Sequence, residues 1–228
     1  INCGYRYNIS VNDGYREDPN GIPWNKKGKI FWVSNYCGSN TVRCPNTGTF
    51  IYNNTVFVNE TLNPEIYFWP DVGDVYVYNN LIVVSQEGEI ISTLLENDQN
   101  ELYISHNLFY DSSRIDLDSD LANNAIYVDP YLLNSDYLGE NSPEAYQTQN
   151  DSPVIGSGFL INGSADTTNY ILHNGGLDYF GNIVSHNIPP NIGAFNGTSN
   201  VDILATKLDE IKIYPNVTND FVNISINN

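Results

Sequence analysis

Three segments of the chain share one pattern of apolar and polar positions. Residues 50–59, 75–84 and 102–111 are runs of β-branched and aromatic residues, and each is interrupted by asparagine. The shared asparagines are Asn54, Asn80 and Asn107, at steps of 26 and 27 residues. Self-similarity at a fixed period of this size indicates a repeat architecture.

The period predicts a chain that winds once per repeat and stacks each new strand on the previous one. A helical repeat would need apolar residues at 3.6-residue spacing, which these segments lack. We expect the asparagine side chains to form a ladder from coil to coil; the alternative is that asparagine only favours turns here. Asn8 and Asn35 fit two earlier coils, but the step from Asn35 to Asn54 is only 19 residues. That coil is therefore short, or the register slips.

These repeats resemble the right-handed parallel β-helix proteins of the pectin-lyase-like group. The Asp-Pro turn within 125–131 and the runs 150–158, 176–182 and 190–195 are similar to the closing segments of such domains. The resemblance covers roughly residues 1–197. It implies an all-β fold, the C-terminal half of a right-handed parallel β-helix, with coils over residues 1–133 and an irregular capping segment over 134–198.

The C-terminal residues resemble a different module. Ile213-Tyr-Pro-Asn216 followed by residues 218–224 is similar to the start of the type A C-terminal sorting domain of the type IX secretion system of Bacteroidetes. The usual second proline of that motif is Val217 here. The resemblance implies that residues 199–228 are a linker and the start of a sorting domain, and that the protein is secreted or held at the cell surface.

Charge narrows the classes of partner. The formal net charge of −18 excludes general binding to nucleic acids. No apolar run approaches ~18 residues, so we expect no membrane span. Residues 1–45 hold six basic and three acidic groups, a balance of +3, and the remainder has a balance of −21. This basic zone can steer an anionic ligand to one place; the alternative is that it only keeps a loop soluble.

The cysteines and the first residue bear on the compartment and on assembly. Cys37 and Cys44 flank a short polar stretch, and in a secreted protein a disulfide between them is favoured over zinc binding. Cys3 is left over. Because Ile1 begins almost directly on a predicted strand, we expect an upstream segment or a partner chain to stack on the N-terminal end.

Candidate chemistry lies in the loop of residues 12–28, where Gly14, Pro19, Gly21 and Pro23 exclude regular structure. Long loops on a rigid solenoid commonly line its binding face. The candidate catalytic residues are Asp13, Glu17 and Lys26. The candidate substrate-binding residues are Arg16 and Lys27 for anionic groups, with Tyr15, Trp24 and Trp32 as flat faces for sugar rings.

A second candidate site is an acidic stretch. Asp116, Asp118 and Asp120 alternate along an extended segment, so their carboxylates point to one side and can share a hard cation such as Ca²⁺. The alternative is a solvated acidic turn.

The preferred functional hypothesis is a protein that binds and cleaves an extracellular, anionic polysaccharide, as a lyase or a glycoside hydrolase. Two other hypotheses stay open: a non-catalytic glycan-binding or adhesive module, and a structural subunit of a larger surface assembly.

Overall fold

The computed structural model describes residues 2–12, 29–38, 42, 44, 48–58, 65–69, 72–84, 89–94, 102–111, 114–116, 125–133, 142–161, 176–198, 212–214 and 223–225. The chain forms two compact units, Ile1–Gly197 and Thr198–Asn228, and each is described by itself.

The first unit contains three parallel sheets of four strands each. Sheet A is formed by β1 (Asn2–Arg6), β4 (Gly48–Tyr52), β7 (Val75–Tyr78) and β10 (Leu102–Ser105). Sheet B is formed by β2 (Ile9–Val11), β5 (Thr55–Val58), β8 (Leu81–Val84) and β11 (Leu108–Asp111). Sheet C is formed by β3 (Lys29–Val33), β6 (Glu65–Phe68), β9 (Glu89–Leu94) and β12 (Arg114–Asp116).

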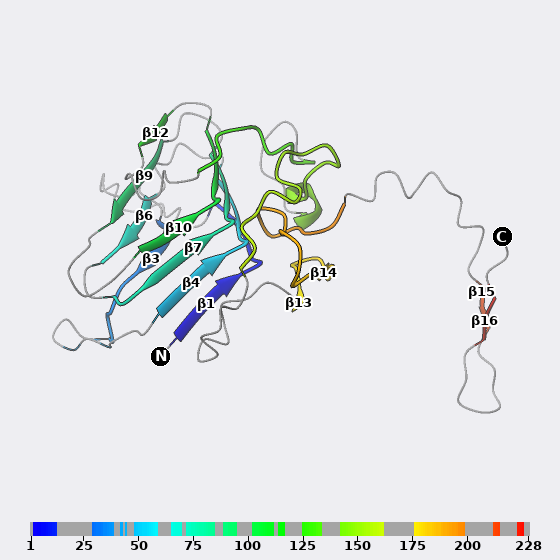
Figure 1. Ribbon diagram of the computed structural model, residues 1–228, viewed down its shortest axis with the longest axis horizontal. Coiled ribbons are helices and arrows are strands. Elements are labelled where there is room, and N and C mark those ends of the chain that lie inside the picture. The colour runs from blue at the N-terminus through cyan, green and yellow to red at the C-terminus, as the bar shows by residue number, and fades with distance from the viewer. Residues whose placement is uncertain are drawn as a thin grey trace, which may run out of the picture. The chain divides into compact units, whose positions relative to one another are not determined.

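The chain passes through sheets A, B and C in turn and repeats this order four times, so each triplet of strands stacks on the previous one. The arrows of β1, β4, β7 and β10 accordingly lie side by side and point the same way (Figure 1). The described residues contain no α-helix, only a short 3₁₀ turn, η2 (Pro143–Tyr146). The predicted winding chain of parallel strands is confirmed at this level: the fold is all-β and compatible with a β-solenoid.

Alternation along the strands builds the interior of the coils. In β7, Val75 and Val77 are buried while Tyr76 and Tyr78 on the opposite face are only half-buried. The inward residues form one cluster that includes Ile51, Val56, Ile66, Phe68 and Ile82. Strands β4, β5 and β8 are buried on both faces, which explains why they appear in the sequence as nearly continuous apolar runs.

A row of asparagines, buried from Asn54 onward, fixes the corner between sheets A and B. Asn8 donates from Nδ2 to Oδ1 of Asn54 (3.1 Å), Asn54 to Asn80 (2.9 Å), and Asn80 to Asn107 (2.9 Å). Each accepting Oδ1 also receives the backbone N–H of the preceding ladder residue, at 2.9–3.1 Å. The predicted ladder is therefore present at these four positions. Its buried amides are satisfied by one another and by backbone carbonyls.

Asn35 does not belong to the ladder, so its predicted place in it is wrong. Asn8 bonds directly to Asn54, 46 residues further on. Asn35 instead follows β3, and its carbonyl accepts the backbone N–H of Cys44 (3.0 Å). The first coil is longer than the later ones because long insertions flank β3, and the 19-residue step was a slip of register.

The residues that follow the coils pack along the outer faces of sheets A and B. Ile126 adds one parallel bridge beyond β11. Further on, Asn79 accepts the N–H of Phe159 at Oδ1 (2.6 Å) and donates Nδ2 to its carbonyl (2.9 Å). Asn53 donates to the carbonyl of Asn191 (2.8 Å). These contacts lie on the second and third coils, and Tyr146 and Val154 share a buried cluster with Leu108 of the fourth coil.

One buried carboxylate organises the last part of this segment. Asp178 accepts four N–H groups: Oδ1 accepts the backbone N–H of Phe180 and of Asn182, and Oδ2 accepts Asn182 Nδ2 and the backbone N–H of Asn196, at 2.6–2.8 Å. This ties the hairpin of β13 (Gly176–Leu177) and β14 (Ile183–Val184) to residues 190–197. We call the described residues that follow the coils, 142–161 and 176–197, the covering segment. Its Gly-, Asn- and Asp-rich motifs therefore hold it together.

The second unit contains one described antiparallel pair, β15 (Lys212–Tyr214) with β16 (Asn223–Ser225). Ile213 and Tyr214, from the run that resembles a sorting-domain motif, lie in β15. Within the described residues of the whole chain, no helix has the length and apolar character needed to cross a membrane.

The ladder generates a first prediction. Asn80→Ala removes an acceptor for two N–H groups of Asn54 and a donor to Ile51 and Asn107, all in buried surroundings. We expect the free energy of unfolding to fall by about 3 kcal/mol, measured by urea denaturation. The control Asn187→Ala, at an exposed turn position, should change it by no more than about 0.5 kcal/mol. Equal effects would contradict the account of the ladder.

The covering segment generates a second prediction, at Gly193. Its φ is +100°, and an added Cβ would lie 2.9 Å from Thr55 Oγ1 and 3.1 Å from Leu81 Cβ. Gly193→Ala should therefore destabilise the protein by roughly 2–4 kcal/mol through both strain and overlap. Gly156→Ala, at φ +64° with open space around it, isolates the strain and should cost about 1 kcal/mol. Thermal or urea unfolding measures both.

Candidate functional site

Exposed aromatic residues gather on the outer face of sheet C. Trp32 in β3 pairs in register with Tyr67 in β6, and Trp69 directly follows that strand. Trp32 is 61% exposed and Trp69 is 37% exposed. The rings of Tyr67 and Trp69 lie 6.3 Å apart in an edge-to-face arrangement. We call Trp32, Tyr67 and Trp69 the aromatic surface.

Alternation in two short strands produces this surface. Phe31 and Val33 point inward from β3, and Ile66 and Phe68 point inward from β6, so the residues between them face outward. The register shifts between Lys29 and Phe31, where β3 has one extra residue. Beyond the strands, the N–H of Trp69 donates to the carbonyl of Val33 (3.0 Å), which extends the pairing past Phe68.

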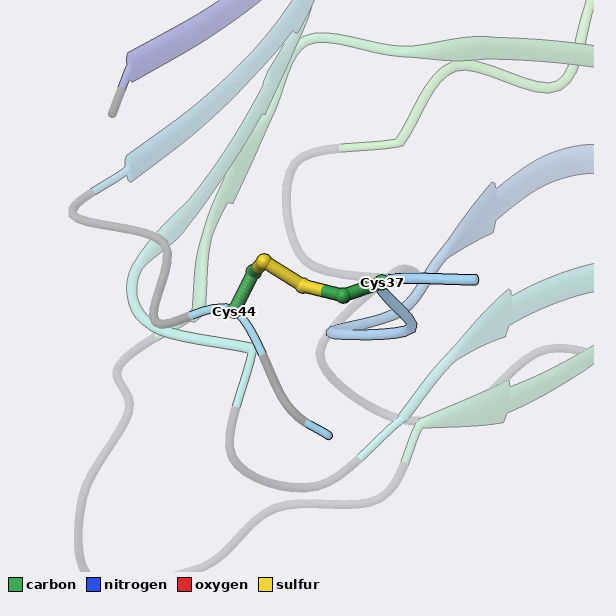
Figure 2. Close-up of a disulfide and its surroundings, with 2 residues drawn as sticks. All are labelled: Cys37 and Cys44. Carbon is green, nitrogen blue, oxygen red and sulfur yellow. A yellow bond between two sulfur atoms is a disulfide. The ribbon is translucent and has the colours of Figure 1, made fainter. Parts of the chain in front are cut away.

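A disulfide braces the chain just after β3. Cys37 and Cys44 are bonded, with Cα atoms 5.7 Å apart (Figure 2). The N–H of Cys44 donates to the carbonyl of Asn35, so the small loop closes back on the end of the strand. Tyr36, which is 54% exposed, lies between these two anchors. Cys3 is a free, exposed cysteine.

Glu65 places a carboxylate beside the aromatic surface. It is only 6% exposed and lies two residues before Tyr67 on β6, so the two side chains project from the same face. Its register partner is Lys29, where the loop of residues 12–28 enters sheet C. The sequence analysis did not single out Glu65. The available signal was an acidic residue at an outward position of an otherwise apolar strand.

Most of the predicted site residues lie outside the described residues: Asp13, Tyr15, Arg16, Glu17, Trp24, Lys26 and Lys27. Trp32 is the described member of that set, and it lies on the outer face as part of the aromatic surface. The loop that carries the others ends at Lys29, three residues before Trp32. Their convergence with the aromatic surface therefore stays a prediction.

The predicted cation site also falls largely outside the described residues. The backbone of Asp116 ends β12, and Asp118 and Asp120 are not described. Elsewhere in the described part of the chain, no three His, Cys, Asp or Glu residues are close enough together to hold a metal ion.

A second set of aromatic residues stacks on the outer face of sheet A, and part of it is buried by the covering segment. Phe50, Tyr76 and Tyr103 stack along the coils with ring centroids 4.7 and 4.6 Å apart. Phe50 is fully buried, and it packs in one cluster with Ile161 and Val184 of the covering segment. Burial also raises the pKa of the neighbouring Tyr78 to about 12, so this phenol stays neutral. The covering segment therefore buries the Phe50 end of this stack, while Tyr103 at the other end is 36% exposed.

Comparison with known proteins finds no matching family model, no matching curated protein and no matching solved structure. Function is therefore inferred from the aromatic surface and from the chemistry predicted for the adjoining loop.

The disulfide generates a third prediction. In the chain-entropy model, a loop of this size stabilises the folded state by up to about 2.5 kcal/mol. We expect Cys37→Ser to lower the free energy of unfolding by up to that amount, measured by urea denaturation without reductant. The matched control is Cys3→Ser, which removes the free, exposed thiol and should have little effect. Equal stability of the two variants would show that the disulfide does not brace the fold.

Proposed function

We propose that this chain is a secreted or cell-surface β-helix that binds an extracellular polysaccharide on the outer face of sheet C. The loop of residues 12–28 supplies the groups that cleave it. The observation that carries the proposal is the aromatic surface. Trp32 places a large ring in solvent beside Tyr67 and Trp69, on a sheet whose opposite face forms the core.

Sugar rings fit such a surface. Exposed aromatic residues that lie together are costly in water and commonly mark a binding site. Trp and Tyr combine a flat apolar face with a polar group, which matches the C–H faces and hydroxyl groups of a pyranose. The sheet also continues along successive coils, so it offers an extended face to a polymer.

The handedness of the coil is part of the proposal. Each coil connects two parallel strands of the same sheet, and such connections are right-handed in about 98% of cases because of the twist of the strands. A right-handed parallel β-helix is the form that the resemblance of the sequence repeats implies.

Charge favours an anionic polymer. The first 45 residues have a balance of +3 in a chain of −18, so an anionic chain is attracted to the coil that carries Trp32. In this proposal Arg16 and Lys27 hold carboxylate or sulfate groups. Lys26 is the base of an eliminating lyase, or Asp13 and Glu17 are the acid and base of a hydrolase. Asp116, Asp118 and Asp120 are a candidate site for Ca²⁺.

A non-catalytic glycan-binding module is the second candidate. A glycoside hydrolase needs two carboxyl groups roughly 5–9.5 Å apart. Within the described residues, Glu65 is the carboxylate that lies beside Tyr67, and it is buried. This observation favours binding without cleavage. The hypothesis that the chain is a structural subunit of a larger surface assembly stays a prediction. So does export through the sorting motif at 213–224.

Binding is tested by a glycan array followed by titration calorimetry with any polysaccharide that the array identifies. Trp32→Ala should weaken binding about tenfold or more, because it removes the most exposed ring of the surface. Tyr179→Ala removes an aromatic side chain of comparable exposure on the β13–β14 hairpin and should leave the affinity unchanged. Equal losses, or none, would exclude the aromatic surface as the binding site.

Cleavage is tested on the same polysaccharide by absorbance of the unsaturated product of a lyase and by release of reducing ends. If the protein is a lyase, Lys26→Ala should abolish elimination. If it is a hydrolase, Glu17→Gln should abolish hydrolysis. In both variants the binding that depends on Trp32 should be retained. Binding without either product would favour the non-catalytic module.

A further inference from the structure

We propose that residues 158–160 form a pH-sensitive latch over the corner between sheets A and B, and that His106 is its trigger. The proposal is independent of the glycan site on sheet C.

The latch contacts Asn79 and His106, two members of a column of four residues at that corner. Tyr7, Asn53, Asn79 and His106 each precede a ladder asparagine, and all have a left-handed backbone with φ between 51° and 56°. Asn53 and Asn79 use neutral amides to bind the covering segment. At the equivalent position of the fourth coil the chain has a titratable imidazole instead. Its ring lies 5.5 Å from that of Phe159.

The surroundings of His106 favour a neutral ring. On its own coil, the Ser105 hydroxyl lies 2.5 Å from Nδ1. From the latch, Phe159 packs on the ring, and Tyr78 of β7 packs on Phe159 at 5.3 Å. Within the described part of the chain, these neighbours bring one titratable group, the neutral Tyr78, and no charged group. Burial lowers the pKa of His106, because the imidazolium loses more hydration here than the neutral ring does.

Ile161, which follows the latch, is buried in the cluster with Phe50 and Val184 and stays in place, whereas few contacts hold Phe159 itself. The position of Phe159 is therefore sensitive to one group. Phe159 is 41% exposed, and its backbone is held by the two hydrogen bonds to Asn79. Gly158 donates to the carbonyl of Pro190 (2.9 Å). When the latch opens, it withdraws Phe159 from Tyr78 and uncovers this end of the aromatic face of sheet A.

The sign of the pH dependence follows from linkage. His106 binds a proton more readily when the latch is open, so acid favours the open form. The stabilisation of the closed latch by neutral His106 is fully present above the usual histidine pKa of about 6.5. It is lost as the pH falls from there towards the lowered pKa of His106 in the closed form. One proton can change the opening equilibrium by at most about tenfold per pH unit.

The test is amide hydrogen exchange by NMR on the full chain between pH 7.5 and 5, corrected for intrinsic exchange rates. Protection at Gly158 and Phe159 should fall with acid, by up to about tenfold per pH unit. Protection at Gly156, whose N–H bonds to Asn191 away from His106, should stay constant. Protection at Phe159 that is constant, or that rises through attraction of the imidazolium to the ring, overturns the proposal.

The matched variant is His106→Asn, which tolerates the left-handed backbone and copies Asn53 and Asn79. It should keep the latch closed and remove the pH dependence. An unchanged pH dependence in this variant would assign the titration to another group. If the variant does not fold, NMR titration of the imidazole in the native chain decides the matter. A His106 pKa at or above 6.5 contradicts the proposal.

Discussion

The fold depends on hydrogen bonding by buried amides at a single corner. A turn between two buried parallel strands leaves backbone groups that water cannot reach, and each such group must find a partner. The ladder residues meet this need from Asn54 onward, because each Oδ1 accepts two N–H groups and each Nδ2 donates to a carbonyl of the coil before it. Register between coils is therefore set by the amides, and the apolar interior fills the space that they define.

The sequence predicted the features that recur in each coil because buried backbone groups need hydrogen-bond partners. Asn54, Asn80 and Asn107 could be recognised because apolar runs of the same length flank each of them, and the structure joins them as expected. Asn35 was misplaced because its flanking residues imitate the pattern: Lys29–Val33 is a strand of sheet C, while the ladder follows strands of sheet A. Period alone cannot separate these cases when an insertion changes the length of one coil.

The site was less predictable, for physical reasons. Trp32 could be identified as an exposed ring from its alternation with Phe31 and Val33, but its neighbours Tyr67 and Trp69 come from the next coil, and their alignment depends on the number of residues between the strands. Glu65 was missed because a carboxylate at the start of a strand usually faces water, and its burial depends on tertiary packing. The chemistry expected of residues 12–28 follows from residue types, which do not fix geometry.

The unequal lengths of the coils have a further consequence. Between Asn8 and Asn54 the chain uses 46 residues where later coils use 26 or 27, yet the rungs above and below match in register. Extra residues around β3 are tolerated because the ladder at the corner between sheets A and B joins successive coils whatever the length of the chain between them. Substitutions and insertions can therefore change the segments beside sheet C, and with them the residues near the aromatic surface, without altering the ladder that joins the coils.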